Sequence, residues 1–206
     1  METEWLNWSR RLAALAQTGL SFTRDPFDRE RYEEMAGIAA HMLARLADLP
    51  VEQVAGLMAP EPGYATPKVD VRGAIVVEDR ILLVQEKSDG RWSLPGGYAD
   101  VGLSASENVV KEIREEAGLE VRVDRLYAVR HKAKGPYDPD LRDFYKLFFL
   151  CEPVAGADVR AGFEVADARF FPPGDLPPLS TARVAVRDIE AAFASREGGP
   201  AGVLFD

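Results

Sequence analysis

Cysteine and histidine are scarce in this sequence, whose 206 residues include one cysteine, Cys151, and two histidines. A single thiol excludes an internal disulfide and a cysteine-based zinc site, and it is compatible with a reducing compartment. Long apolar runs are also missing, since no stretch approaches the ~18 residues needed to cross a bilayer. The N-terminus is acidic where a secretion signal is basic. We therefore expect a cytoplasmic protein with no membrane partner.

Basic residues are the minority, because 25 Lys and Arg stand against 34 Asp and Glu and leave a formal net charge of −9. A surface of that sign repels nucleic acid, so a nucleic-acid partner is not expected. Residues 122–146 are the local exception, since their seven cations and four acids sum to +3 (7 − 4). This local charge favours an anionic substrate.

Residues 1–65 are expected to form a helical N-terminal arm. Apolar residues near the start recur at spacings of three and four, which predicts a helix with one buried face. A second helix should begin after Asp25, because this residue is a good N-cap and Pro26 suits the first helical position. A third helix is expected over about 50–58, and the prolines of residues 59–67 predict a linker. The predicted buried stripes are Trp5, Trp8, Leu12, Leu15 and Ala16 in the first helix, and Tyr32, Met35, Ile38, Ala39, Met42, Leu43 and Leu46 in the second.

Residues 66–206 are expected to form a second domain, because the apolar period changes from near four to near two. β-branched and aliphatic runs at 69–77 and 80–85 predict an antiparallel hairpin. The sequence thus predicts an α+β fold, a helical arm followed by a mixed β-sheet domain with one helix in its middle. Further elements are expected as strands near 121–131, 143–151 and 168–171 and as a last helix over 181–195 with Ser180 as its cap.

The middle helix of this domain carries three neighbouring carboxylates. Ser104 and Glu107 stand in capping-box spacing, so the helix should start just after Ser104. Glu112, Glu115 and Glu116 then share one face at 100° per residue. Like charges at this spacing disfavour a helix unless something compensates, and hard oxygen donors suit Mg²⁺ or Mn²⁺ rather than zinc. A solvated acidic face is the alternative that the spacing alone leaves open.

The segment around this helix resembles the Nudix box. Residues 97–119 match most fixed positions of the family pattern. The segment Leu94-Pro95-Gly96-Gly97, which ends on the first glycine of the box, also resembles the residues that usually precede it. That pattern has Gly, five residues, Glu, seven residues, Arg-Glu, an apolar residue, any residue, Glu-Glu, any residue, Gly and an apolar residue. Two positions depart from it, with Leu103 in place of the box glutamate and Lys111 in place of the arginine. Glu107 precedes Lys111 by four residues and is a candidate to hold it, and a solvated lysine is the alternative.

The resemblance implies a mixed sheet with flanking helices, an α/β/α sandwich, over about residues 68–195. It also implies hydrolysis of a diphosphate linked to another moiety. The metal, Mg²⁺ or Mn²⁺, would be held by the three glutamates and the Gly96 carbonyl. In many members of the family a further glutamate outside the box acts as base, and Glu164 is the candidate here because it lies in a loop before a predicted strand. Glu152 and Asp167 are its rivals, and a surface carboxylate is the alternative role for Glu164.

Substrate contacts are expected from cationic and aromatic side chains near the box. Lysine and arginine suit phosphate, and aromatic rings can stack on a base, although such rings more often belong to a core. Trp92 and Phe144 are two such rings. The substrate-binding candidates proper are Tyr98, Arg130, Lys132 and Tyr137.

The helical arm sharpens the expected substrate class. Nudix proteins with such a segment ahead of the box resemble those acting on nucleoside diphosphates linked to a small group, of the ADP-ribose, CDP-choline or UDP-sugar type. The expected products are a nucleoside monophosphate and a phosphorylated second moiety. A ligand-binding regulator is the alternative, because Leu103 weakens the box. The arm holds more large apolar residues than short helices can hide, so a homodimer through the arm is expected, with packing on its own sheet domain as the alternative.

Overall fold

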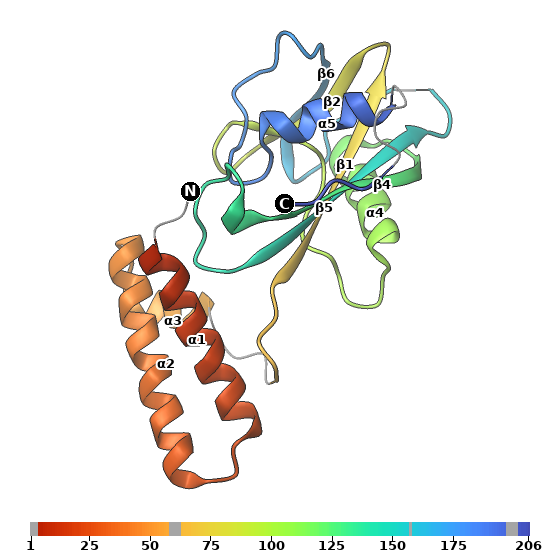
Figure 1. Cartoon of the computed structure of the whole chain (residues 1–206). Helices are drawn as coiled ribbons and strands as arrows, with labels where there is room; N and C mark the ends of the chain where they lie inside the picture. The colour runs from red at the N-terminus through yellow and green to blue at the C-terminus, as the bar shows by residue number, and fades with distance from the viewer. Residues whose placement is uncertain (1–3, 58–62, 157, 197–201) are drawn as a thin grey trace. The chain divides into compact units, whose positions relative to one another are not determined.

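The computed structural model describes residues 4–57, 63–156, 158–196 and 202–206. The chain divides into two compact units, Met1–Lys68 with Pro139–Asp143, and Val69–Asp138 with Phe144–Asp206 (Figure 1). The return of Pro139–Asp143 to the first unit was not predicted from the sequence. Of the predicted linker, residues 59–62 lie outside the described residues. Within the described part of the chain, no helix is long and apolar enough to span a bilayer.

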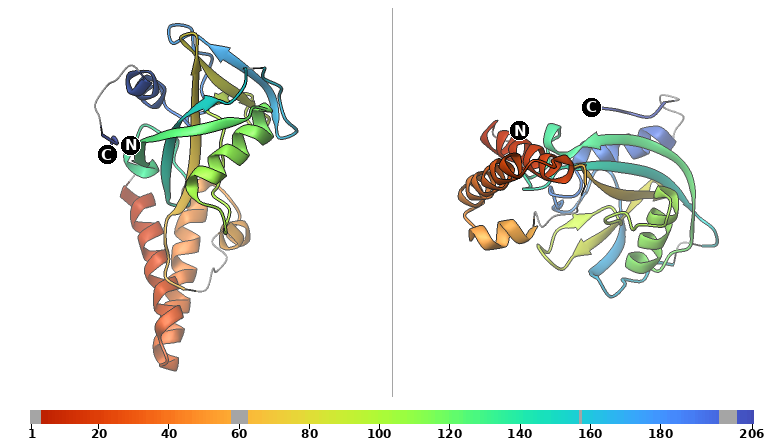
Figure 2. Two further views of the ribbon diagram at one scale, coloured as in Figure 1. Left: turned by 90° about the vertical axis from the view of Figure 1, so that its right-hand side faces the viewer. Right: turned by 90° about the horizontal axis from the view of Figure 1, so that it is seen from below.

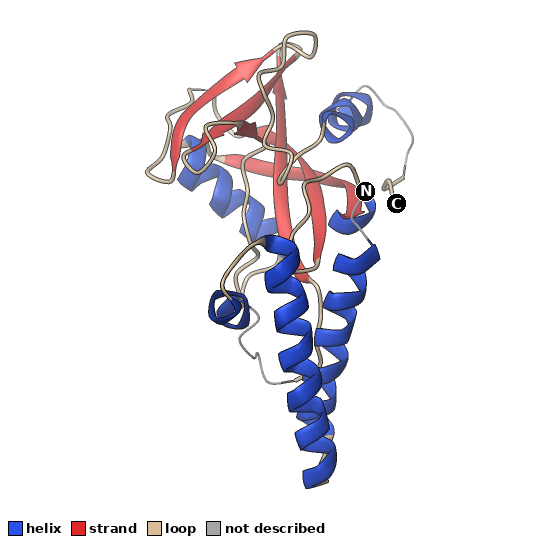
Figure 3. Cartoon of the chain, turned by 90° about the vertical axis from the view of Figure 1, so that its left-hand side faces the viewer, coloured by secondary structure: helices blue, strands red, loops and turns tan. Residues whose placement is uncertain are grey.

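The first unit is built on a pair of long helices that lie side by side (Figure 3). Its helices are α1 (Glu4–Phe22), α2 (Pro26–Ala47) and α3 (Val51–Leu57). The Asp25 carboxylate caps α2 as predicted, because it accepts from the amides of Phe27 at 2.8 Å and Asp28 at 3.0 Å. Gly19 lets the two helices approach closely, since a Cβ there would lie 2.4 Å from the Tyr32 ring.

The buried face of α1 differs from the predicted one. Its buried residues are Leu6, Ser9, Arg10, Ala13 and Ala16. Trp5 and Leu15, both assigned to the buried stripe, are 60% and 61% exposed. Arg10 is buried because its guanidinium donates to the carbonyl oxygens of Asp140 and Arg142, each at 3.0 Å. Apolar residues of α1 occur around much of its circumference, so their periodicity alone could not identify the face that packs.

The second unit is a sheet with strand order β3-β2-β1-β5-β4, with β6 paired to β2. The predicted hairpin is confirmed, since β1 and β2 pair antiparallel with Val76 opposite Ile81. β4 and β5 form a second antiparallel pair. The strands are β1 (Lys68–Val77), β2 (Arg80–Glu86), β3 (Trp92–Ser93), β4 (Val121–His131), β5 (Phe144–Pro153) and β6 (Val165–Phe171).

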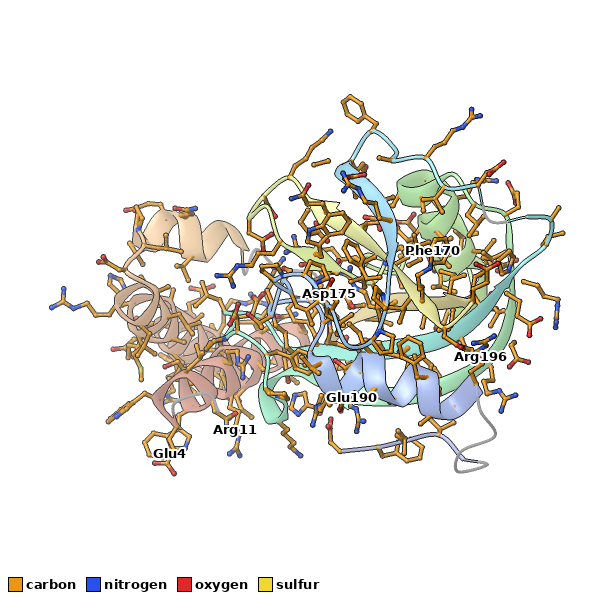
Figure 4. The ribbon with its side chains drawn as sticks, turned by 90° about the horizontal axis from the view of Figure 1, so that it is seen from above. Glu4, Arg11, Phe170, Asp175, Glu190 and Arg196 are labelled. Atoms are coloured by element: carbon orange, nitrogen blue, oxygen red, sulfur yellow. The ribbon has the colours of Figure 1, made fainter. Side chains whose placement is uncertain are left out.

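Two helices cover opposite faces of this sheet, α4 (Ala105–Ala117) and α5 (Val186–Arg196) (Figure 2). Side chains alternate along each strand, so β1 gives Ile75 to the α4 side and Ala74 to the α5 side. In Figure 4, seen from above, α5 with its labelled Glu190 lies on one side of the strands and α4, in green, on the other. Because both faces are buried there, β1 and β2 carry continuous apolar runs at 74–77 and 81–84. The predicted α/β/α arrangement is confirmed.

The last helix begins later than predicted. It starts at Val186, and residues 181–183 form a turn instead. Ser180 does not cap it, because its hydroxyl donates to Asp89 at 2.7 Å. The amide of Ala185, just before the helix, is instead satisfied by Asp188 in the first turn, whose carboxylate accepts from it at 2.9 Å. The 3-10 turn η1 (Lys132–Lys134) was also not predicted.

Candidate active site

The loop of residues 94–97 is docked on strand β1. The Gly73 amide donates to the Pro95 carbonyl and the Val71 amide to the Gly97 carbonyl, both at 2.9 Å. Gly96 has φ 145°, and a Cβ on it would lie 2.0 Å from the Val71 carbonyl oxygen. Only glycine combines this backbone conformation with so close an approach. The loop therefore presents its peptides to α4 in one fixed orientation.

Glu116 meets this loop from α4. The capping box predicted for the start of that helix is present, so Ser104 and Glu107 set its register. Glu116 is 6% exposed, and its carboxylate accepts from the Gly96 amide at 2.8 Å. Burial raises its pKa to about 7, although the Arg72 guanidinium acts in the opposite direction. A carboxylate so poorly compensated is one that a bound cation would stabilise.

Glu112 lies one turn earlier and faces the same loop. A Cβ on Gly97 would be 2.9 Å from its carboxylate oxygen, so Gly97 leaves the space that Glu112 occupies. Burial raises the pKa of Glu112 as well. Glu115 is more exposed, and its carboxylate lies 3.1 Å from the Lys111 amine. The helix thus brings two glutamates to the loop and leaves the third at the rim.

The predicted pair between Glu107 and Lys111 is wrong. The Glu107 carboxylate is used by the capping box, where it accepts from the Ser104 amide at 2.7 Å. The Lys111 amine instead lies 3.1 Å from Asp100 and 3.8 Å from Glu112, besides its contact with Glu115. A helix N-terminus needs acceptors for its free amides, and this need outweighs a side-chain pair one turn away.

The loop that carries Glu164 lies against the end of α4. The Gly162 amide donates to the Glu116 carbonyl at 2.9 Å, and a Cβ on Gly162 would lie 1.7 Å from the Glu115 carbonyl. Glu164 is exposed, and its charge contributes to the raised pKa of Glu112. The loop therefore places Glu164 near the glutamate cluster.

The two rivals of Glu164 are engaged elsewhere. The Glu152 carboxylate forms an ion pair with Arg122 on the neighbouring strand. The Asp167 carboxylate pairs with Arg169 and also accepts from the Ala168 amide. The charge of Glu164, by contrast, acts on Glu112 of the box.

The donor set suits a hard divalent cation. Three carboxylates and a glycine-rich loop offer oxygen ligands only, which Mg²⁺ and Mn²⁺ prefer. Across the described ranges no three acidic, histidine or cysteine side chains are already gathered as a metal site. Two glutamates are held by other partners, Glu116 by the Gly96 amide and Glu115 by Lys111. The residues fit a metal, with Glu112 and Glu116 nearest to the loop.

Two of the predicted substrate contacts share one aromatic neighbour. The Tyr98 ring stacks on Phe144 with 5.6 Å between centroids and 9° between planes. The Lys132 amine lies 5.2 Å from the Phe144 centroid. Tyr98 is 50% exposed, so part of its ring is open to a ligand. Trp92 is a core residue instead, since it is buried and packs edge-on against Phe171 at 4.7 Å.

The other two predicted substrate contacts, Arg130 and Tyr137, are not brought to the glutamates. Both are buried around Asp188, whose carboxylate accepts from the Tyr137 hydroxyl at 2.8 Å. Burial raises the pKa of Tyr137, and the Asp188 charge raises it further. Arg130 donates to the Phe205 carbonyl at 3.1 Å. The Tyr137 hydroxyl and Arg130 Nη1 thus have internal partners, whereas Arg130 Nε and Asp188 Oδ1 have no hydrogen-bond partner among the described residues.

A buried charge triad, Asp70, Arg72 and Lys146, was missed by the sequence analysis. The three residues are 5%, 4% and 2% exposed. Asp70 accepts from Arg72 at 3.0 and 2.9 Å and from Lys146 at 2.9 Å. Burial alone would raise the pKa of Asp70, but the two cations outweigh it and lower the value to about 2. The available signal was the pair of charges at alternate positions of an otherwise apolar strand.

Known proteins resemble both units of the chain. The model of the NUDIX domain matches residues 67–192, and a model described as the UDP-X-like, N-terminal oligomerisation domain matches residues 3–58. The second match coincides with the helical arm, and the first contains the glutamate cluster and its loop.

Individual relatives agree with these matches. YjhB of Bacillus subtilis, provisionally named an ADP-ribose pyrophosphatase, is 46% identical over 183 residues, which cover 89% of this chain and 88% of that protein. The crystal structure of a UDP-X diphosphatase covers 98% of both chains at 37% identity, with a TM-score of 0.64. An ADP-ribose pyrophosphatase from Streptococcus suis covers 68% of this chain and 100% of its own at 40% identity, with a TM-score of 0.62.

Proposed function

Because the chain belongs to the Nudix family and is a Nudix hydrolase, we propose that it cleaves the diphosphate of a nucleoside diphosphate linked to a second moiety. The products are a nucleoside monophosphate and the phosphorylated second moiety. The observation that carries this proposal is the meeting of Glu112 and Glu116 with the loop of residues 94–97. The relatives named for ADP-ribose and UDP-X support the substrate class.

Glu112, Glu115 and Glu116 would hold the divalent cation, with the Gly96 carbonyl as a further oxygen donor. Nudix hydrolases generally use divalent metals, and we propose Mg²⁺, with Mn²⁺ as a substitute. When bound, such a cation neutralises diphosphate charge and lowers the pKa of water. The carboxylates of Glu112 and Glu116 gain most from it, because burial already raises the pKa of both groups.

Glu164 is proposed as the general base. Its carboxylate is exposed, at the end of a loop that bonds to α4 beside the ligands. From there it accepts the proton of the water that attacks phosphorus. Tyr98 offers the open part of its ring for stacking on the nucleoside base. Lys132 is only 6% exposed and lies over the Phe144 ring, so we assign it no contact with the diphosphate.

The exposed apolar residues of the arm support a homodimer. Trp5 and Trp8 pack edge-on against each other at 5.2 Å, yet they are 60% and 46% exposed. Leu15 and Phe22 continue the exposed apolar surface along α1. Contiguous apolar surface of this kind marks an interaction site. We propose that two copies of the arm cover it, in agreement with the oligomerisation-domain match.

A substrate panel tests the proposed activity. Hydrolysis of ADP-ribose, CDP-choline, UDP-glucose, NADH, dinucleoside polyphosphates and nucleoside triphosphates is compared by kcat/KM with Mg²⁺, with Mn²⁺ and with EDTA. We expect the highest kcat/KM for a nucleoside diphosphate derivative and no turnover in EDTA. A preference for triphosphates would overturn the substrate class. Metal-dependent binding without turnover would favour the regulator that Leu103 leaves as the alternative.

A further inference from the structure

Arg72 is the member of the buried charge triad that reaches the loop of residues 94–97. Its Nη1 donates to the Leu94 carbonyl at 3.1 Å. Its Nε and Nη2 are both taken by Asp70. A guanidinium is planar, so a carboxylate that fills one edge also fixes the direction of the remaining donor. Asp70 thereby aims Arg72 at the loop.

The bond from Arg72 completes a set of three between strand β1 and the loop. Its neighbours Val71 and Gly73 donate their backbone amides to Gly97 and Pro95. Arg72 is the residue between them, and its side chain binds the loop just before Pro95. The peptide held within this set is that of Gly96, whose amide donates to Glu116.

Burial excludes a direct role in substrate binding for Arg72 in this conformation, because only 4% of the residue is exposed. Burying three charges is costly compared with apolar residues of similar size, so fold stability alone does not explain them. A role in geometry accounts for the pair of Asp70 and Arg72, because the carboxylate fixes the direction in which the guanidinium donates.

We propose that Arg72 is a positioning residue: locked by Asp70, it holds the Leu94 carbonyl and thereby fixes the Gly96 peptide against Glu116. The consequence for catalysis rests on the proposed function, but the effect on the loop exists without substrate or metal. The two can therefore be tested separately.

Two variants separate positioning from simple burial of charge. Arg72→Lys keeps the charge beside Asp70, but one amine cannot serve both Asp70 and the Leu94 carbonyl in the fixed geometry of a guanidinium. Lys146→Met is the matched control, because it removes an equally buried cation from the same carboxylate. Lys146 contacts Asp70 and the Tyr137 ring rather than the loop. Arg72→Gln replaces Arg72→Lys if the latter does not fold.

Amide hydrogen exchange on the metal-free full chain is the first measurement. Exchange at Gly96 is divided by exchange at Leu83, a buried residue of β2, to remove any change in global stability. We expect Arg72→Lys to raise this ratio at least about 10-fold and Lys146→Met to change it by less than about 2-fold. An unchanged ratio in Arg72→Lys, or an equal rise in Lys146→Met, would overturn the proposal.

Steady-state kinetics with Mg²⁺ and the best substrate of the panel are the second measurement. A displaced Gly96 peptide should lower kcat by about 10-fold or more and leave KM within about 3-fold, because the substrate itself does not touch Arg72. A rise in KM at constant kcat would assign Arg72 to substrate binding and contradict positioning. If the wild-type enzyme cleaves nothing in the panel, the proposed function fails, and the exchange ratio alone decides on Arg72.

Discussion

The two units of this chain treat apolar and charged residues in opposite ways. In the helical unit the buried cluster is small, and large apolar side chains such as Trp5 and Phe22 remain exposed. In the sheet unit both faces are buried in apolar clusters, and charged residues lie inside as well. The members of the helical cluster are Leu6, Leu43, Ala44 and Val54. The buried charges of the sheet unit include Asp70, Arg72, Glu116, Lys146 and Asp188.

Exposed apolar side chains and buried charged side chains both cost stability, but they indicate different roles. Exposed apolar area loses about 25 cal/mol per Å² of possible stabilisation, which a partner can recover. Buried charge costs free energy unless an ion-pair partner or a bound cation compensates it, and it persists where paired groups position one another. The helical unit therefore points to assembly, and the sheet unit points to chemistry.

The largest expected effect is on the chemistry of the sheet unit. Glu116→Gln should lower kcat by at least about 100-fold, because it removes a charged ligand from the transition-state environment. The protein should stay folded and keep its oligomeric state, as circular dichroism and light scattering can verify. Glu120→Gln, an exposed carboxylate just beyond α4, is the control and should retain activity. Equal activity of the two variants would contradict the ligand assignment.

The loop that faces Glu116 provides the next test. Gly96→Ala should cost about 2–4 kcal/mol, because the added Cβ meets the Val71 carbonyl and the backbone conformation is unfavourable for alanine. Urea unfolding measures this loss. Gly174→Ala is a matched control with nothing within 4 Å of its Cβ. A loss as small as that of the control would mean that the loop can move away from β1.

The buried charges of the sheet unit should also respond to pH. The pKa of Asp70 falls from 3.8 in the unfolded chain to about 2 in the fold. Its stabilisation, about 2 kcal/mol, is therefore complete above pH 4 and is lost as the pH falls through about 2. The stability difference between wild type and Asp70→Asn should shrink over that range in thermal or urea unfolding.

The smallest expected effect concerns assembly by the helical unit. Replacing Trp5 and Trp8 together by serine should raise the dimer dissociation constant at least about 10-fold, because apolar area leaves the interface. Sedimentation or light scattering measures it. Val154→Ser, an exposed apolar residue of the sheet unit, should leave it unchanged.

A chain that starts at Thr66 extends this test to the whole arm. It should be monomeric if the arm carries the contact. A dimer of that shortened chain would move the interface to the sheet unit. A full-length chain that is monomeric at about 50 µM would exclude the dimer.

Local signals predicted most elements of both units. The Asp25 cap and the Ser104–Glu107 capping box each act within one helical turn, so their residues suffice to place the helix starts. The hairpin of β1 and β2 likewise depends on adjacent residues. The last helix was placed too early because Ser180 resembles an N-cap in isolation, whereas the fold brings Asp89 to its hydroxyl.

The candidate site was predictable where one helix carries it and unpredictable where several strands meet. Glu112, Glu115 and Glu116 share a face because of helical geometry alone, so their spacing in the sequence is enough to predict it. Arg130 and Tyr137 instead lie around Asp188 of a distant helix, which accepts a hydrogen bond from Tyr137 and forms an ion pair with Arg130, and charge and aromaticity alone do not reveal this.

The sequence by itself determined the family, the helix of glutamates and the glycine loop before it, because these depend on short spacings along the chain. Tertiary structure decided which face of α1 is buried, that Pro139–Asp143 joins the helical unit, and that Arg72 lies behind the loop. Each of these depends on contacts between residues far apart in sequence. Arg10 meets Asp140 across 130 positions and Lys146 meets Asp70 across 76, separations over which local propensity carries no information.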